Sequence, residues 1–386
     1  MSYDLLITSG TLIDPAQGLH ARRDVAFAGG TVAAVAESLD ATQAREVVDA
    51  AGCLVTPGLI DLHVHVFPGV SHLGIEPDPH CLARGATTVV DAGSAGADTF
   101  AGFRKYVIEV SQTRILATLN ISTQGMLSPH VGELQLLEYA DVDRCCRTIE
   151  QHRDLILGVK VRLTRDSIVS QRCGLEPLHR ARAAADAAGL PVMVHPNMAW
   201  ADSLDDVLAL MRPGDLLTHT YHGSACGILD GDRRVRPAVL EAVERGVLLD
   251  VGHGAGSFAW DVVEPALEQG LLPHTISSDL HTGNLHGPVF DLATVCSKFL
   301  HLGLSLDEVF RRVTAVPAGV IGMADRIGTL APGAWGDAVV FELRQGRFEL
   351  QDAPRQTRTG RQKLEPVTAI KGGRVYRQRP PREGDR

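Results

Sequence analysis

The sequence lacks the features of membrane and nucleic-acid-binding proteins. No apolar run approaches the roughly 20 residues that cross a bilayer, and an acid, Asp4, stands where a secretory signal has basic residues. The 46 acidic residues outnumber the 37 basic ones, which gives a net charge of −9 and disfavours a nucleic-acid partner. The seven cysteines are odd in number and form no CxxC pair, as is typical of free thiols in a reducing compartment. We therefore predict a cytoplasmic protein with no membrane or nucleic-acid partner.

The composition is otherwise that of an ordinary globular protein, apart from high counts of 39 glycines and 16 histidines. Apolar residues make up 45% and charged residues 22% of the 386 positions, which excludes a disordered or fibrous chain. At about 150 residues per domain, the length predicts two to three units unless one of them is a large α/β barrel.

Short apolar runs broken by Gly, Asp and Pro occupy both ends of the chain. They predict strands at residues 5–7, 10–13, 24–27 and 31–35, and again at 337–341, 368–370 and 372–376. A basic, polar insertion separates the strands at 337–341 and 368–370. Because neither end could bury its apolar faces alone, we expect residues 1–57 and 326–378 to form one small composite β-sandwich domain. A frayed tail is expected at 379–386.

The middle of the chain, residues 58–325, alternates apolar runs with helical patterns. Eight runs are short enough for strands, at residues 58–66, 86–91, 114–121, 155–163, 191–195, 215–221, 247–251 and 274–279. Helical spacing appears at 175–188, 204–211, 235–245 and 258–269, and Gly189, Gly246 and Gly270 stand where helices should end. This alternation predicts an α/β fold with a parallel sheet, and eight units match the (β/α)₈ TIM barrel of about 250 residues. A doubly wound open sheet is the alternative, because strand counting does not prove closure.

Polar residues gather near the carboxyl ends of these runs, where barrel enzymes place their active sites. His63 and His65 are two residues apart on one strand, so both point to the same face, which is the interior in a barrel. The other polar residues at or just after the ends of the runs are Lys160, Arg162, His195, His219, Tyr221, His253 and Asp279.

Four inward histidines and an aspartate suggest a divalent metal site, because imidazole nitrogens and carboxylate oxygens are ligands of Zn²⁺ and similar ions. A cationic lysine would repel a metal, so Lys160 joins such a cluster only if it is neutral or carboxylated to a carbamate. A carbamate could bridge two ions, which could hold a hydroxide between them and polarise a carbonyl. Asp279 could then take the hydroxide's proton and deliver it to the leaving group.

Residues 55–65, VTPGLIDLHVH, resemble the first barrel strand of the amidohydrolase superfamily, in its dihydroorotase/hydantoinase-like branch. Residues 158–160, 192–195, 217–219 and 277–279 are similar to its later ligand strands, and residues 328–338 to its return into the β-domain, so the resemblance covers residues 4–376. It implies that His63, His65 and Asp279 bind one metal, that His195 and His219 bind the second, and that carboxylated Lys160 bridges them. It also implies that Asp279 and Lys160 are catalytic and that the chain is a homo-oligomer. Zinc is the expected ion, although manganese and iron accept the same ligands.

The substrate is less clear, because the chain departs from the dihydroorotase pattern. Phe67-Pro68-Gly69 stands where dihydroorotases have an arginine after the HxH motif, and residues 279–284, DLHTGN, replace their DHAPH run. Residues 159–162, 219–223, 250–254 and 257–258 look closer to a group often mislabelled dihydroorotase, whose known members include deacetylases of acetylated α-hydroxy acids such as acetyl-(R)-mandelate. The resemblance therefore implies a deacetylase of small acetylated α-hydroxy or amino acids. A cyclic amidohydrolase and a metal-free interaction protein with the same fold are the alternatives.

Five further residues are candidates for contact with a small substrate that carries a carboxylate. Arg162 shares the parity of Lys160 and suits a carboxylate, or else a structural salt bridge to a residue such as Asp91. His253 is expected to contact the substrate or the attacking water. The remaining candidates for the pocket are Tyr221, His222 and His281.

Overall fold

A parallel β-sheet forms the centre of the molecule. The computed structural model describes residues 2–377, so the predicted tail at 379–386 lies outside the described residues. Seven strands pair in chain order, every pair parallel: β8 (Leu59–Val64), β9 (Ala86–Gly96), β10 (Arg114–Asn120), β11 (Ile156–Arg162), β12 (Val192–His195), β13 (Leu216–Leu217) and β14 (Leu248–Leu249). All residues of β8 and β9 are buried, as expected for strands covered on both faces. The predicted α/β barrel class is confirmed.

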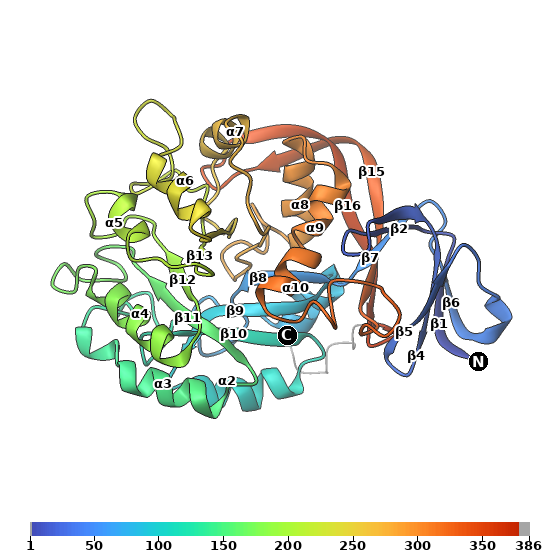
Figure 1. Cartoon of the computed structure of the whole chain (residues 1–386), viewed down its shortest axis with the longest axis horizontal. Helices are drawn as coiled ribbons and strands as arrows, with labels where there is room; N and C mark the ends of the chain where they lie inside the picture. The colour runs from blue at the N-terminus through green and yellow to red at the C-terminus, as the bar shows by residue number, and fades with distance from the viewer. Residues whose placement is uncertain (1, 378–386) are drawn as a thin grey trace.

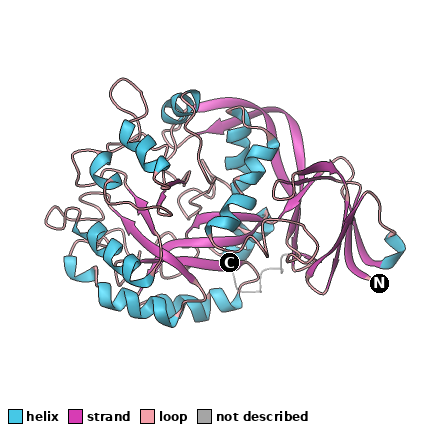
Figure 2. Cartoon of the chain, in the orientation of Figure 1, coloured by secondary structure: helices cyan, strands magenta, loops and turns pink. Residues whose placement is uncertain are grey.

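Helices lie outside this sheet: α1 to α6 on the connections between its strands and α7 to α10 after the last strand, β14 (Figure 2). They are α1 (Pro77–His80), α2 (Phe100–Tyr106), α3 (Val142–Gln151), α4 (Glu176–Ala188), α5 (Leu204–Leu208), α6 (Pro237–Glu244), α7 (Trp260–Glu268), α8 (Leu292–His301), α9 (Leu306–Arg311) and α10 (Ala315–Val320). The left-handed backbone at Gly189, Gly246 and Gly270 follows α4, α6 and α7 as predicted. No helix within residues 2–377 has the length and apolarity to span a bilayer, and the cytoplasmic location stays a prediction.

The prediction of an eighth strand at 274–279 is wrong, because this segment closes the ring without forming a strand. Gly254 donates to the Ser278 carbonyl at 3.0 Å on one side, and Asp279 donates to the His63 carbonyl at 2.7 Å on the other. A regular ladder is interrupted because Asp279 has a φ of +50° and Ser278 donates to the Asp61 carboxylate. This break in the ladder leaves the Asp279 side chain at the mouth of the barrel.

Two further sheets form the β-domain, which both ends of the chain supply. One sheet has the order β5 (Thr31–Ala36), β4 (Asp24–Ala28), β1 (Tyr3–Thr8) and β6 (Ala44–Asp49). The other has the order β17 (Arg374–Val375), β16 (Thr357–Lys371), β15 (Ala338–Gln351), β7 (Leu54–Pro57), β2 (Thr11–Asp14) and β3 (Leu19–Arg22). Buried apolar side chains from both ends of the chain form one core here, including Leu5, Phe27, Val340 and Ile370. The exact domain limits stay a prediction.

The polar insertion predicted between two short C-terminal strands is instead part of a long hairpin. β15 and β16 remain paired from Ala338–Ile370 to Gln351–Thr357, and Figure 1 shows them leaving the β-domain and passing over the barrel beside α8. Their outer face is polar and exposed, whereas Leu350 and Leu364 are buried. Strands with an exposed polar face are difficult to predict from the sequence, because they show little alternation of apolar and polar residues.

Candidate metal centre and substrate cavity

The six predicted metal ligands come together in one cavity at the carboxyl ends of the barrel strands. His63 and Lys160 belong to β8 and β11, and His195 ends β12. His65 and His219 follow β8 and β13, and Asp279 ends the irregular segment at 274–279. The cavity has a volume of about 340 Å³, at the small end of the usual range for ligand sites. All six side chains line it: His63, His65, Lys160, His195, His219 and Asp279.

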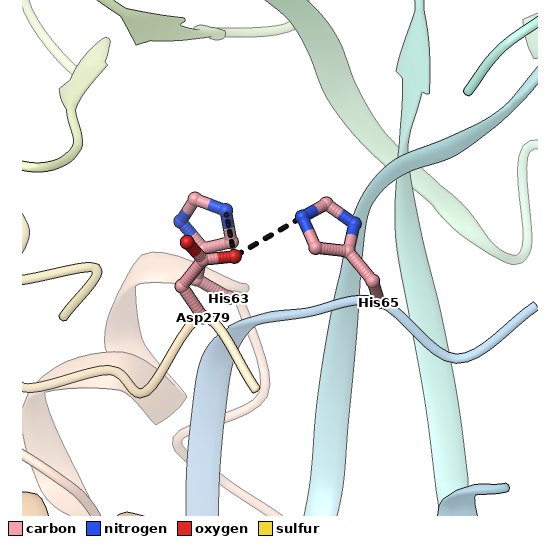
Figure 3. Close-up of side chains that lie close together, drawn as sticks. All are labelled: His63, His65 and Asp279. Atoms are coloured by element: carbon pink, nitrogen blue, oxygen red, sulfur yellow. Dashed lines mark ion pairs between the residues drawn. The ribbon is translucent and has the colours of Figure 1, made fainter. Parts of the chain in front are cut away.

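Asp279 lies between the first two histidines (Figure 3). Its Oδ1 atom is 3.1 Å from His65 Nε2 and 3.4 Å from His63 Nε2, and the three ligand atoms lie within 4.8 Å of one another. Asp279 Oδ1 is also buried without a hydrogen-bond partner in the described part of the chain. A buried carboxylate oxygen without a donor is costly, so this atom is placed to meet a cation.

Hydrogen bonds fix which nitrogen of each imidazole faces that centre. Thr218 donates its hydroxyl to Asp250 Oδ2 at 2.7 Å, so its oxygen accepts the Nδ1 proton of His63 at 2.8 Å. The Nδ1 atom of His219 lies 2.6 Å from the Gly252 carbonyl, which can only accept. In both rings the lone pair therefore stays on Nε2, available to a metal.

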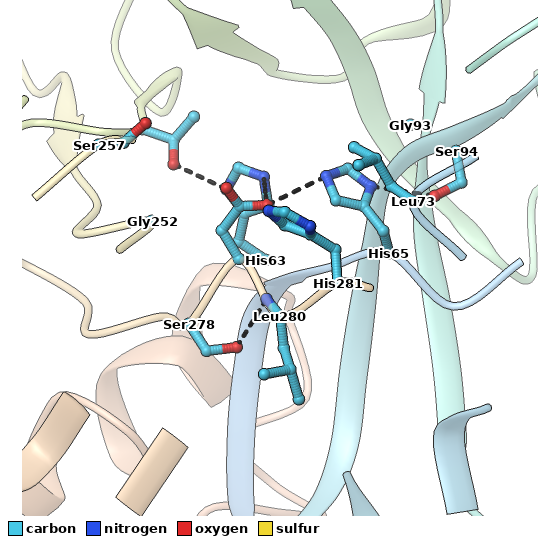
Figure 4. Close-up of polar contacts among 12 residues, drawn as sticks. His63, His65, Leu73, Gly93, Ser94, Gly252, Ser257, Ser278, Leu280 and His281 are labelled. Carbon is cyan, nitrogen blue, oxygen red and sulfur yellow. Dashed lines mark hydrogen bonds and ion pairs between the residues drawn. The ribbon is translucent and has the colours of Figure 1, made fainter. Parts of the chain in front are cut away.

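The other two histidines have comparable supports. His65 Nδ1 lies 3.0 Å from the Ser94 hydroxyl (Figure 4). His195 contacts the Thr164 hydroxyl through Nε2 at 3.1 Å, which leaves Nδ1 for a cation. The ring centroids of His195 and His219 are 4.2 Å apart, so these two side chains lie close enough to share a second cation.

The electrostatics of the site favour neutral donors. Burial, followed by nearby positive charge, lowers the pKa of His63, His65 and His195 well below the ordinary value, and burial lowers the pKa of His219 to about 3. Neutral imidazoles keep the lone pair that a metal needs.

Lys160 is fully buried, and burial lowers its pKa to about 7. Its Nζ atom lies 3.4 Å from His63 Nε2. Gly93 makes room for this side chain, because a Cβ there would lie 2.6 Å from Lys160 Cγ. The donor set thus fits divalent cations, provided that Lys160 is neutral or carboxylated.

Arg162 and His281 also line the cavity, as the sequence predicted. Arg162 forms a salt bridge as well, but its partner is Glu133 and not Asp91. Asp91 instead accepts hydrogen bonds from the backbone of Val66 at 2.8 Å and Ser94 at 2.7 Å. Glu133 stands alone in a long loop, and no spacing in the sequence signals its role.

Tyr221, His222 and His253 do not line the cavity, so the expected substrate contacts find no support. Tyr221 is fully buried and donates to the Leu271 carbonyl at 3.1 Å. The prediction placed Tyr221 with His219 at the end of one strand, but His219 has a φ of +60° and the chain turns between them.

His222 and His253 are turned toward other groups. The Nδ1 atom of His222 lies 2.8 Å from the Ser224 hydroxyl, and it is Ser224 that reaches the cavity. His253 stacks on Phe258, with 4.5 Å between ring centroids, and its Nε2 atom lies 2.6 Å from Lys298 Nζ. His253 therefore belongs to a buried junction below the cavity wall.

The sequence reading missed the rest of the cavity wall. These residues lie in loops after the strands, where neither strand parity nor helical spacing applies. They are His72, Leu73, Thr164, Asn197, Met198, Ser224, Ala255, Gly256 and Ser257. The rule that loops form the mouth of a barrel identifies such segments but not which of their side chains point inward.

Comparisons with known proteins identify the family. The family model described as the amidohydrolase family matches residues 295–376. The chain is 35% identical to Deacetylase Atu3266 of Agrobacterium fabrum over 351 residues, which cover 90% of this chain and 85% of the relative.

Two solved structures are similar over almost their whole length. One, titled as an adenine deaminase, has a TM-score of 0.89 and 31% identity and covers 98% of this chain and 100% of its own. The other, titled as a dihydroorotase, has a TM-score of 0.87 and 35% identity and covers 96% of this chain and 97% of its own. These relatives carry different activity names but share one superfamily. The chain therefore belongs to the amidohydrolase superfamily and is a hydrolytic enzyme.

Proposed function

We propose that this metal-dependent hydrolase removes the acetyl group from small acetylated α-hydroxy or amino acids. The observation that carries the proposal is the presence of Arg162, a carboxylate-binding side chain, in the same cavity as the six candidate ligands. The relative from Agrobacterium fabrum that is named a deacetylase supports the same reaction.

The ligand geometry supports two zinc sites. His63, His65 and Asp279 would hold one ion, and His195 and His219 the other. Lys160, as the carbamate that its neutral amine forms with CO₂, would lie between them. Ions bound there supply the ionisation of water at neutral pH and the polarisation of the acyl carbonyl.

Asp279 would move the proton in this reaction. Hydrolysis adds water across the acyl bond and yields acetate and the free hydroxy or amino acid. Asp279 accepts the proton that the water loses and gives it to the leaving oxygen or nitrogen as the acyl bond breaks.

Arg162 would hold the substrate carboxylate. Glu133 engages Nη1 of Arg162, and Asn120 holds Glu133 from behind through a 3.0 Å hydrogen bond. A guanidinium has five N–H donors, so this fixed ion pair leaves donors for a second carboxylate. Arg162 would thus favour substrates that carry a carboxylate.

Cyclic amides are the weaker alternative. Phe67, in place of an arginine after the HxH motif, is 4% exposed and packs 4.7 Å from the Phe103 ring, so it offers no charge to a ring substrate. A test compares hydrolysis of acetyl-(R)-mandelate, N-acetyl amino acids, dihydroorotate and hydantoins, together with elemental analysis of the protein. Turnover of the ring substrates alone would contradict deacetylation, and less than one equivalent of metal after growth with zinc would favour a metal-free interaction protein.

The proposed binding of the substrate carboxylate by Arg162 can be tested separately. We expect Arg162→Met to raise KM about 10- to 100-fold for an acetylated acid but to leave its neutral methyl ester unaffected. Arg165→Met is the matched control, because Arg165 lies over Trp200 and does not line the cavity. The homo-oligomeric state stays a prediction that light scattering can test.

A further inference from the structure

We propose that the loop at residues 255–257 borders the subsite for the substituent on the substrate's α-carbon, that Gly256 sets the size of this subsite, and that Asn197 beside it accepts a hydrogen bond from the N–H of an acylated amine. This inference rests on the proposed deacetylation of α-substituted acids. It follows from the position of this loop relative to Arg162, from the space at Gly256 and from an unpartnered atom of Asn197.

The loop at residues 255–257 lies across the mouth of the barrel from Arg162, the proposed carboxylate-binding residue. Arg162 ends β11, the fourth strand of the ring, and the loop at 255–257 follows β14, the seventh. An α-carbon carries the acylated atom, the carboxylate, a hydrogen and one substituent. If the acyl group meets the ligands and the carboxylate meets Arg162, the substituent points away from both, toward the rest of the cavity lining, which includes this loop.

Gly256 leaves this wall of the cavity open. A Cβ built there meets no atom within 4 Å, although the residue lines the cavity. Its backbone lies outside the left-handed region, so a larger side chain could be introduced without strain. Gly256 is exposed and lines the cavity of about 340 Å³, so a larger side chain there would add bulk at the edge of the cavity.

Asn197 marks the same wall as a ligand site. Its residue is 8% exposed, its Nδ2 donates to the Ser257 hydroxyl at 3.1 Å, and its buried Oδ1 has no partner in the described part of the chain. A buried acceptor in a cavity wall fits a donor on the ligand. The amide N–H of an N-acetyl amino acid is such a donor, whereas an acetylated hydroxy acid has none at that atom.

The test is a series of acetylated acids whose α-substituent is hydrogen, methyl or phenyl. We expect Gly256→Leu to lower kcat/KM for the phenyl substrate about 100-fold and to leave the hydrogen substrate within about 3-fold, with Gly256→Ala between them. Calorimetric dissociation constants of the product acids should change in the same order. Gly231→Leu is the matched control, because Gly231 is exposed, meets no atom within 4 Å and lies outside the cavity.

The outcomes separate this inference from the proposed function. An equal loss across the series, or no loss for the phenyl substrate, would overturn the subsite while deacetylation stands. Failure of the unaltered enzyme to hydrolyse any member would overturn deacetylation and the subsite together.

Asn197→Ala provides a second test of the wall. We expect KM to rise about 10-fold for an N-acetyl amino acid but not for the O-acetyl acid of the same shape. The O-acetyl acid is the internal control, since it offers no donor at the atom that the Asn197 side chain would meet. Equal KM changes for amide and ester would refute the assigned donor.

Discussion

The hydroxyl of Thr218 is the most direct test of how the protein prepares its metal ligands. It accepts the Nδ1 proton of His63 at 2.8 Å and donates to Asp250 Oδ2 at 2.7 Å. Thr218→Val removes both bonds with almost no change of shape. Asp250 keeps hydroxyl donors from Thr275 and Ser277, so the main loss falls on His63.

The free-energy cost of Thr218→Val is expected only when a cation binds His63 Nε2. In the metal-free variant the imidazole can move its proton to Nε2, so no buried Nδ1–H needs an acceptor. A bound cation forces the proton back to Nδ1, whose nearest carboxylate oxygen, Asp250 Oδ2, is 3.8 Å away. An unmet buried donor costs about 1–3 kcal/mol, so we expect zinc affinity to fall about 10- to 100-fold.

Competition with a chromophoric chelator measures this affinity, and Thr220→Val is the matched control. Thr220 is as buried as Thr218, but its hydroxyl bonds only the carbonyls of Leu217 and Asp250. Both variants should unfold at similar temperatures without metal, whereas only Thr218→Val should bind zinc more weakly. Equal zinc affinities for the two variants would refute the role of the Thr218 hydroxyl in holding the His63 proton.

Three further predictions concern buried charged groups. Lys160→Met should bind at most about one equivalent of metal by elemental analysis, because the bridging carbamate is lost; two retained equivalents would contradict this. Asp279→Asn should lower kcat about 10²- to 10⁴-fold in steady-state assays while KM changes less, since the proton acceptor is lost; an unchanged kcat would exclude the role. Burial lowers the pKa of Lys298 to about 7 from 10.5, so the unfolded chain binds more protons between these values. Stability relative to Lys298→Met should therefore rise from pH 7 to 10.5 in thermal unfolding, and a flat difference would disprove it.

The sequence predicts well those barrel strands that are buried along their whole length. β9 and β10 appear as continuous apolar runs because both faces are covered. The predicted run at 215–221 fails in part: only Leu216–Leu217 pairs, because the Asp215 carboxylate accepts from the backbone of Val192 and the chain turns at His219. Side-chain hydrogen bonds of this kind replace ladder bonds, and no periodicity records them.

The candidate ligands could be found because they stand in a recognisable order, each at the end of a run. The residues that hold these ligands in place by hydrogen bonds could not be found in this way. Thr218, Ser94 and Asp250 are common residue types at unremarkable spacing, and each acquires its role only through contact with a distant segment. The same holds for Glu133, which meets Arg162 from a loop with no regular structure.

Buried carboxylates explain why ligand spacing alone does not define the site. Asp61 accepts from the backbone of His63 at 3.2 Å and of Ser278 at 3.0 Å, so one acid fixes two ligand segments that lie 215 or more residues apart. Burial raises the pKa of Asp61 to about 7 despite these bonds, which means that its charge is held at a cost to folding. Because Asp61 holds the backbone and not the rings, its loss would displace His63 and Asp279 without removing a ligand. The HxH motif therefore supplies the donors, whereas acids scattered along the chain set the distances between them.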